Sequence, residues 1–313
     1  MKNLKGSLIL FTAAFLWGTT FVAQVSGAGH MGVFTYNASR CCVGWLFLLI
    51  VSLVRDKVTI HSSIKNKNAA GHGNTEHTDK GRDSGHEPGG WPVKGGILCG
   101  IVLFLAMSLQ QAGISLYPDD VAAAGRSGFL TAIYVVIVAV IVSIAGRRLN
   151  KPVLLSVIGT VIGMYLLCMR GGLSGVYTGD ILSLACACCF AVHILVVDRY
   201  RNTDSIKLSC IQFLVSGMLA LIMCLITEKV VIVDIISAAG PILYAGILSS
   251  GVAYTLQMIG QKYTEPAVAS IVMSLESVIA VVAGAVVLNE VLAGREIAGC
   301  IVVFISVIIA QQG

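Results

Sequence analysis

This chain has few charged residues. Only 12% of its 313 residues are Asp, Glu, Lys or Arg, whereas an ordinary soluble domain has about 25%. The chain is 56% hydrophobic and its mean hydropathy is +0.87. A chain this long and this apolar cannot bury its surface in water. The composition therefore excludes a soluble enzyme, a disordered protein and a nucleic-acid binder.

Signature motifs of enzymes and nucleotide-driven pumps are also missing. There is no H-E-x-x-H, no G-x-S-x-G and no G-x-x-x-x-G-K-[ST]. The spacing Gly27-x-Gly29-x-x-Gly32 matches the dinucleotide fingerprint, but it joins two apolar runs and no strand precedes it. We therefore expect no enzyme activity, no cofactor and no resident metal, so that any work must be driven by gradients.

Long apolar runs are abundant, and a run of about 20 residues is enough to cross a bilayer. The sequence predicts an all-α polytopic membrane protein with ten transmembrane helices. We expect them near residues 6–26, 33–54, 95–116, 121–144, 153–170, 179–198, 207–227, 240–262, 267–289 and 296–312.

The distribution of Lys and Arg predicts the orientation of these spans. If the N-terminus is cytoplasmic, the inside segments hold 16 Lys and Arg and the outside segments hold three. Seven of the 16 lie in the long second loop, 55–94. Cytoplasmic loops carry the excess of positive charge, so we expect both termini in the cytoplasm and the protein in a bacterial-type plasma (inner) membrane.

The chain also repeats itself weakly. Residues 6–22 align with 179–195 at an offset of 173, and Leu109–Gly113 aligns with Leu256–Gly260 at an offset of 147. The long second loop accounts for the difference between the offsets. Five helices per repeat is an odd number, so the second repeat must be inverted, as in many secondary transporters. We expect a first repeat over 1–170 and a second over 171–313.

Several segments, in their order along the chain, resemble EamA-type proteins of the drug/metabolite transporter superfamily. Leu16–Val22 resembles the WG-x-x-F opening of that family, Ser127–Val136 looks like its fourth helix, and the stretches Ala253–Thr264 and Ser274–Glu290 are similar to its eighth and ninth helices. The resemblance implies two inverted five-helix EamA repeats that carry a small organic metabolite or drug-like compound, often outward.

The sequence departs from this family at two places. The family often has proline where Ala139 and Ser277 stand here. We therefore expect any helix bending to depend on glycine or on packing defects instead.

Four ionisable side chains lie well inside predicted spans, where a charge costs about 2.5–3.5 kcal/mol. Glu276 lies near the midplane of the ninth span; it is either a hydrogen-bonded link between helices or a substrate or proton site. Arg126 begins the fourth span and is a candidate for the outer vestibule. For Arg40 and His193 we favour structural roles, although His193 aligns with Thr20 and stays a candidate.

Polar side chains also form stripes on three predicted helices, and in lipid such stripes must face protein or a wet cavity. We favour a cavity over simple interhelical hydrogen bonds, because three helices show the pattern and the resemblance places them around the central pathway. With Gln110, the candidate pathway residues are Trp17, Thr20, Gln24, Gln110, Arg126, Ser127, Thr131, Tyr134, His193, Tyr254, Gln257, Gln261 and Glu276.

A histidine-rich loop supports the main alternative. Residues 61–86 hold four His among carboxylates, glycines and asparagines, which is typical of a solvated linker and only weakly of a Zn²⁺ site. The preferred interpretation is a secondary carrier whose partners are its substrate and the bilayer. A divalent-metal carrier and a non-transporting membrane enzyme or scaffold stay as alternatives, and the sequence leaves open proton coupling and a homodimer.

Overall fold

The computed structural model describes residues 2–28, 31–69, 90–118, 123–146, 149–168, 176–288 and 294–310. All regular structure within these ranges is helical, which confirms the predicted all-α fold class. Seven of the helices are unbroken: α1 (Lys2–Ala28), α2 (Val33–Ala69), α3 (Val93–Ser115), α6 (Lys151–Cys168), α7 (Thr178–Arg199), α8 (Ser205–Thr227) and α14 (Gly294–Ala310).

The other three predicted spans are assembled from shorter helices. They are α4 (Ala123–Ala132) with α5 (Tyr134–Ile144); α10 (Ala239–Tyr244), the π-helix η1 (Ala245–Ala253) and α11 (Tyr254–Gly260), preceded by the short α9 (Ile232–Ser237); and α12 (Pro266–Met273) with α13 (Leu275–Leu288).

Eight of the ten predicted spans coincide with described helices that are long and apolar enough to cross a membrane. The other two coincide with α6, of 18 residues, and α14, of 17 residues. Helices of this length extend about 26 Å, slightly less than a bilayer core. The multi-pass architecture is therefore confirmed, whereas the count of ten stays a prediction.

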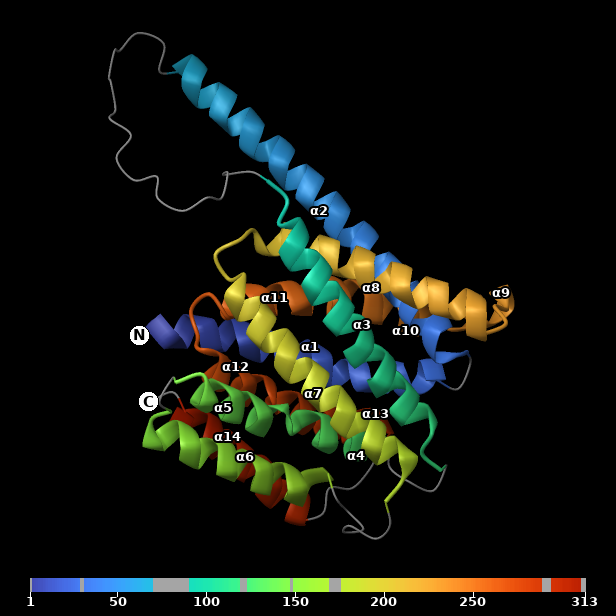
Figure 1. Ribbon diagram of the computed structural model, residues 1–313, viewed down its shortest axis with the longest axis vertical. Helices are drawn as coiled ribbons and strands as arrows, with labels where there is room; N and C mark the ends of the chain where they lie inside the picture. The colour runs from blue at the N-terminus through green and yellow to red at the C-terminus, as the bar shows by residue number, and fades with distance from the viewer. Residues whose placement is uncertain are drawn as a thin grey trace.

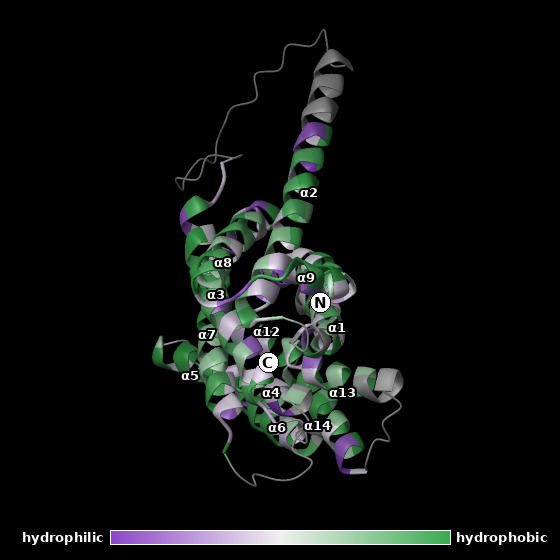
Figure 2. Ribbon diagram, turned by 90° about the vertical axis from the view of Figure 1, so that its right-hand side faces the viewer, coloured by the Kyte–Doolittle hydropathy of each residue, from purple (hydrophilic) through white to green (hydrophobic). Residues whose placement is uncertain are grey.

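Apolar residues make up most of the helices, which are largely green in the hydropathy colouring of Figure 2, and many of their side chains are exposed on the outside of the bundle. Ile144 is 81% exposed, Ile226 73% and Leu225 69%. A monomeric soluble protein rarely exposes apolar side chains on this scale. In a membrane, these side chains would contact the lipid.

The helices pack in matching pairs. α6 packs against α14 at one edge of the bundle, and α2 packs against α8 at the other (Figure 1). Between these edges α3 contacts α7 and α8, while the eighth span contacts α1 through α11 and α2 through η1. Exchanging the first five spans with the last five maps one set of contacts onto the other, which is the packing expected of two similar five-helix units. The predicted boundary between 170 and 171 stays a prediction.

The second loop begins later than predicted. α2 continues to Ala69, so the segment up to residue 69, which was expected to belong to the loop, is helical. Figure 1 shows this end of α2 projecting away from the bundle. A run without proline or glycine from Val58 to Ala69 favours this continuation. His72, His77 and His86 lie outside the described residues.

The fourth and ninth spans each break once, at Ile133 and at Ser274. Neither residue is a glycine, which was one of the two means of bending, beside packing defects, that the sequence led us to expect. At Ser274 the hydroxyl donates to the carbonyl of Ile271, 2.7 Å away, and such bonds back to the preceding turn bend helices. The eighth span is instead interrupted by the π-helical turns of η1, a form frequent at functional sites.

Candidate functional site

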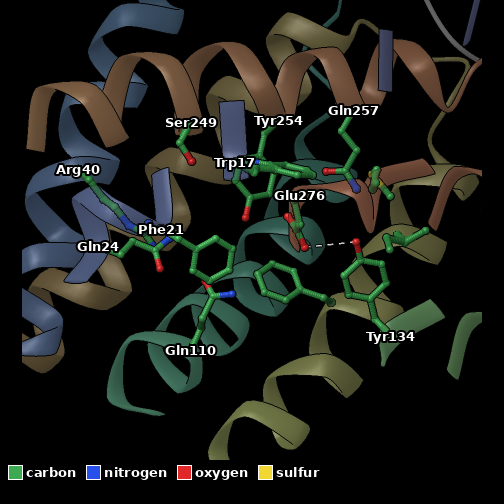
Figure 3. A pocket seen from close by; sticks show the side chains of 13 residues that line it. Trp17, Phe21, Gln24, Arg40, Gln110, Tyr134, Ser249, Tyr254, Gln257 and Glu276 are labelled. Carbon is green, nitrogen blue, oxygen red and sulfur yellow. Dashed lines mark hydrogen bonds between the residues drawn. The ribbon is translucent and has the colours of Figure 1, made fainter. Parts of the chain in front are cut away.

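A narrow polar cavity lies in the middle of the bundle, where the broken helices meet (Figure 3). It leaves about 40 Å³ to the centres of water-sized molecules, which is room for about three waters. The side chains that line it are Trp17, Phe21, Gln24, Arg40, Gln110, Tyr134, Phe190, Ile194, Ser249, Tyr254, Gln257, Met273 and Glu276. They come from both halves of the chain.

The breaks in the fourth and ninth spans bring a carboxyl and a phenol together. Tyr134 is the first residue of α5 and Glu276 is in the first turn of α13. The Tyr134 hydroxyl donates to the Glu276 carboxyl over 3.3 Å, the contact dashed in Figure 3. Both side chains are buried, with Glu276 only 8% exposed. Among the described residues, the Glu276 carboxyl in the cavity therefore accepts one hydrogen bond, from Tyr134.

Helix α1 can approach this carboxyl because it has no side chain at Gly18. A Cβ there would lie 2.7 Å from the carbonyl oxygen of Glu276 and 2.6 Å from the Cβ of Ile279. The neighbouring Trp17 lines the cavity. The sequence Trp17-Gly18 thus places a large aromatic side chain in the cavity wall, while the backbone of Gly18, which has no side chain, packs directly against α13.

Tyr254 forms the aromatic wall of the cavity. Its ring centroid lies 4.8 Å from that of Trp17, 5.3 Å from that of Phe213 and 5.8 Å from that of His193, each ring pair edge to face. Packed edge-to-face rings are fixed in orientation. His193 itself contacts Gln212, with 3.1 Å between its Nε2 and Oε1 of the amide, so it supports the wall from behind.

Arg40 also lines the cavity, from α2. It is only 3% exposed, and the ring of Tyr36 lies 5.4 Å from its guanidinium carbon. No hydrogen bond or ion pair to Arg40 is found within the described ranges, and its Nε is buried without a partner. An uncompensated buried charge costs several kcal/mol. Its position on a polar cavity therefore makes Arg40 a candidate for binding a ligand.

Three further polar atoms around the cavity are buried without a hydrogen-bond partner in the described residues. They are the donor Nε1 of Trp17 and the acceptor Oε1 atoms of Gln24 and Gln257. Buried polar groups are nearly always satisfied in folded proteins. Such atoms also occur elsewhere in the described bundle, so at the cavity they show only that its wall carries polar groups to which a ligand could bind.

The structure brings seven of the thirteen predicted pathway residues to the cavity: Trp17, Gln24, Gln110, Tyr134, Tyr254, Gln257 and Glu276. It places the other six in contacts between or within helices. Thr20 donates to the carbonyl of Leu16 at 2.6 Å, and the Gln261 amide donates to that of Ile194 at 3.0 Å.

The remaining four also face neighbouring helices. Ser127 hydrogen bonds with Ser183 at 3.0 Å, because α4 packs on α7 there. Thr131 is buried but does not line the cavity, His193 supports the aromatic wall, and Arg126 forms an ion pair. These positions fit the interhelical hydrogen bonding that the sequence offered as the alternative to a cavity.

Arg126 does not meet Glu276, although the two lie on neighbouring broken spans. Its Nε instead donates to the Asp180 carboxylate at 2.6 Å and its second nitrogen donates at 2.8 Å. Tyr117 adds a third donor to Asp180 at 2.9 Å. Burial raises the pKa of Tyr117, which keeps its hydroxyl protonated as a donor. This buried network lies at the start of α7.

A second ion pair lies beyond the other end of α7. The Arg55 guanidinium binds both oxygens of Asp204, at 2.5 and 3.0 Å, and Asp204 also caps α8 by accepting from the backbone N–H groups of Ile206 and Lys207. Burial raises the pKa of Asp204, whereas these hydrogen bonds and the positive charge of Arg55 lower it. The lowering effects are larger together, so the pKa lies below its usual value.

Sequence reasoning missed six lining residues: Phe21, Arg40, Phe190, Ile194, Ser249 and Met273. Five of them carry no signal that separates them from ordinary core residues. Arg40 was visible as a charge within a span, yet it was assigned to the scaffold. The structure places it inward because Gly44 lets α2 approach η1, with only 2.8 Å between a Cβ there and that of Ser250.

No group of three or more His, Cys, Asp or Glu side chains able to hold a metal ion occurs in the part of the chain that the structure describes. The cavity contributes one such ligand, Glu276. Most of the histidine-rich loop lies outside that part.

Comparisons with known proteins agree with the fold. Residues 177–311 match the model of the EamA-like transporter family. A protein of Archaeoglobus fulgidus described as an uncharacterized transporter is 27% identical over 99% of this chain and 87% of its own length. A crystal structure covering 98% of both chains has a TM-score of 0.73 at 19% identity, which shows the shared fold alone.

Proposed function

We propose that this chain, whose residues 177–311 match the model of the EamA-like transporter family, is a secondary carrier of that family that moves a small organic metabolite across the membrane through the central cavity. It works by alternating access and exports its substrate. The energy comes from a gradient, with protons as the coupling ion.

The observation that carries this proposal is the cavity itself. Polar groups inside an apolar bundle are expensive and mark substrate paths. Here they gather where the fourth, eighth and ninth spans are interrupted. Discontinuous helices around a midplane site are characteristic of secondary transporters. The narrowness of the cavity fits a closed conformation, which must open to admit a metabolite larger than a few waters.

Closure and opening have structural candidates at both ends of α7. The Arg126–Asp180 pair lies at its start and the Arg55–Asp204 pair lies beyond its end. α7 has 22 residues, so the two pairs are separated by about 33 Å along its axis. Breaking one pair while the other persists would open one side of the cavity at a time.

The proposed setting is a bacterial inner membrane with both termini in the cytoplasm. Lys and Arg follow the positive-inside pattern for this orientation. The start of α1 and the end of α14 lie on the same side of the bundle (Figure 1), as an even number of spans requires.

The alternatives have less support. A divalent-metal carrier needs several carboxylate or imidazole ligands on its path, and the cavity has one carboxyl. A membrane enzyme needs paired acid and base groups or a nucleophile with its base, and Glu276 has Tyr134 as its only hydrogen-bond partner in the described residues. A pure scaffold gives no reason for Arg40 to be buried without a hydrogen bond or ion pair from the described residues.

Uptake by proteoliposomes tests the proposal. The purified chain is reconstituted and screened against a metabolite mixture with and without a pH gradient. Ser249→Tyr places a ring in the narrow cavity and should reduce the transport of any hit to the protein-free background. Ser237→Tyr, on the exposed surface of α9, should transport at the wild-type rate. Transport that survives Ser249→Tyr in a well-folded protein would place the path elsewhere.

A further inference from the structure

Arg40 and Glu276 are the only charged groups among the side chains that line the cavity, and they do not pair with each other. In Figure 3 Arg40 and Gln24 lie at one end and Tyr134 and Glu276 lie toward the other. Glu276 already accepts a hydrogen bond from Tyr134. Within the described residues the one contact found for the Arg40 guanidinium is with the ring of Tyr36, and its Nε has no hydrogen-bond partner, so its N–H groups can donate to a ligand.

Resting on the proposed function, we propose that Arg40 binds a carboxylate group of the transported substrate. The guanidinium is planar and presents parallel N–H donors that match the two oxygens of a carboxylate. An anion supplied by the substrate compensates a charge that is otherwise buried without a partner. Arg40 is thus the residue that selects substrates with an acidic group.

A single carboxylate fits this site better than a phosphate. Among the described residues that line the cavity there is one cation, Arg40, and no lysine, so a dianionic phosphate would keep an uncompensated negative charge in a low-dielectric space. Gln24, which lies beside Arg40 in Figure 3, and Trp17 add an unpartnered acceptor and an unpartnered donor. The rings of Phe21 and Tyr254 provide an apolar surface for the rest of the molecule.

Two kinds of substrate carry this chemistry, and the role of Glu276 distinguishes them. A simple organic acid needs only Arg40. An α-amino acid also brings an ammonium group, which Glu276 can receive at the other end of the cavity.

The test measures binding to the purified full-length protein by its thermal stabilisation, with four probes: hexanoate, its amide, L-leucine and L-leucinamide. The proposal expects at least one of the two acids to bind, and its amide to bind about tenfold more weakly or worse, the effect of losing one charge-assisted hydrogen bond. Equal binding of acid and amide, or no binding of either acid, would overturn it.

Variants separate recognition from folding. Arg40→Gln should lose the preference for acid over amide, and Arg40→Lys should keep part of it. Arg295→Gln is the matched control, since Arg295 also stacks on a tyrosine, 5.0 Å from the ring of Tyr165, but is exposed and away from the cavity. Size-exclusion chromatography and circular dichroism check folding. Undiminished preference in folded Arg40→Gln would contradict the proposal.

The outcomes also separate this proposal from the proposed function. Glu276→Gln should weaken leucine binding if the substrate is an amino acid and leave hexanoate binding unchanged if it is a simple acid. Arg40-dependent binding without uptake by proteoliposomes would support Arg40 as a carboxylate-binding residue and contradict the proposed transport. Uptake of a substrate without an acidic group, unaffected by Arg40→Gln, would support the transporter and contradict the role of Arg40.

Discussion

Charged side chains in this protein are paired near the ends of the bundle and unpaired at its centre. Asp180 and Asp204 each hold an arginine, whereas Arg40 and Glu276 face the cavity without an ion-pair partner in the described residues. Pairing lowers the cost of burying a charge, so the two groups that forgo it are the ones with a reason to meet a ligand. The paired groups instead contribute to stability, and this can be measured at Asp204.

Asp204→Ala should lower the melting temperature in detergent. The change removes the cap of α8 and the partner of Arg55, for a loss of about 1–2 kcal/mol, with the ion-pair share small because Asp204 is partly exposed. The folded pKa of Asp204 is lowered, so its contribution is present above the unfolded value near 3.8 and is lost as pH falls through the folded value. The difference from wild type should therefore be constant from about pH 5 to 8 and shrink below about pH 4. An equal difference at pH 3 and pH 7 would contradict this assignment.

Among the helices, α1 is the element on which the site geometry depends most. It contacts α13, η1 and α11, and its approach to α13 relies on the absence of a side chain at Gly18. The breaks at Ile133 and Ser274 act with it, because they bring Tyr134 and Glu276 within hydrogen-bond distance. Small shifts of these elements should therefore affect transport as well as stability.

Gly18→Ala should displace α1 from α13. A Cβ at this position lies 2.7 Å from a backbone oxygen, which cannot rotate away, so we expect a loss of about 1–3 kcal/mol, typical of overpacking, together with slower transport. Gly240→Ala is the control, because nothing lies within 4 Å of a Cβ there. Its melting temperature should be unchanged or higher. If both variants melt and transport alike, the contact has no functional role.

The sequence was sufficient for the helices and for part of the site, for identifiable reasons. Apolar runs and charge asymmetry depend on local composition, so nearly all spans could be located from them. Trp17, Tyr254 and Glu276 stood out because they are polar or aromatic groups in spans. The orientation of Arg40, the break at Ile133 and the contact that engages Arg126 depend on how distant helices pack, and no local pattern encodes that.

At the scale of the whole molecule, α6 packs with α14 and α2 packs with α8, which is the arrangement expected of the two inverted repeats that the sequence predicts. Such an arrangement requires adjacent spans to alternate in direction across the membrane. It also fixes which loops share a side, and this can be tested without knowing the substrate.

Reporter fusions after Ile60 and after Asp204 should report the cytoplasm, and fusions after His30 and after Asp119 should report the exterior. The reason is the 16-to-3 distribution of Lys and Arg. Paired alkaline phosphatase and fluorescent protein reporters give opposite readouts at each site and so control for expression. Reversed signals at two of the four sites would contradict the orientation.

The central claim is that the cavity around Glu276 is the coupled transport path, and the most direct measurement is uptake driven by a pH gradient in proteoliposomes of three variants. Glu276→Gln should keep its helix content and lose gradient-dependent transport, Glu276→Asp should keep part of it, and Glu265→Gln, an exposed carboxyl at the start of the same span, should match wild type. Wild-type rate and pH dependence in Glu276→Gln would contradict the account and leave the carboxyl as an interhelical hydrogen-bonding group.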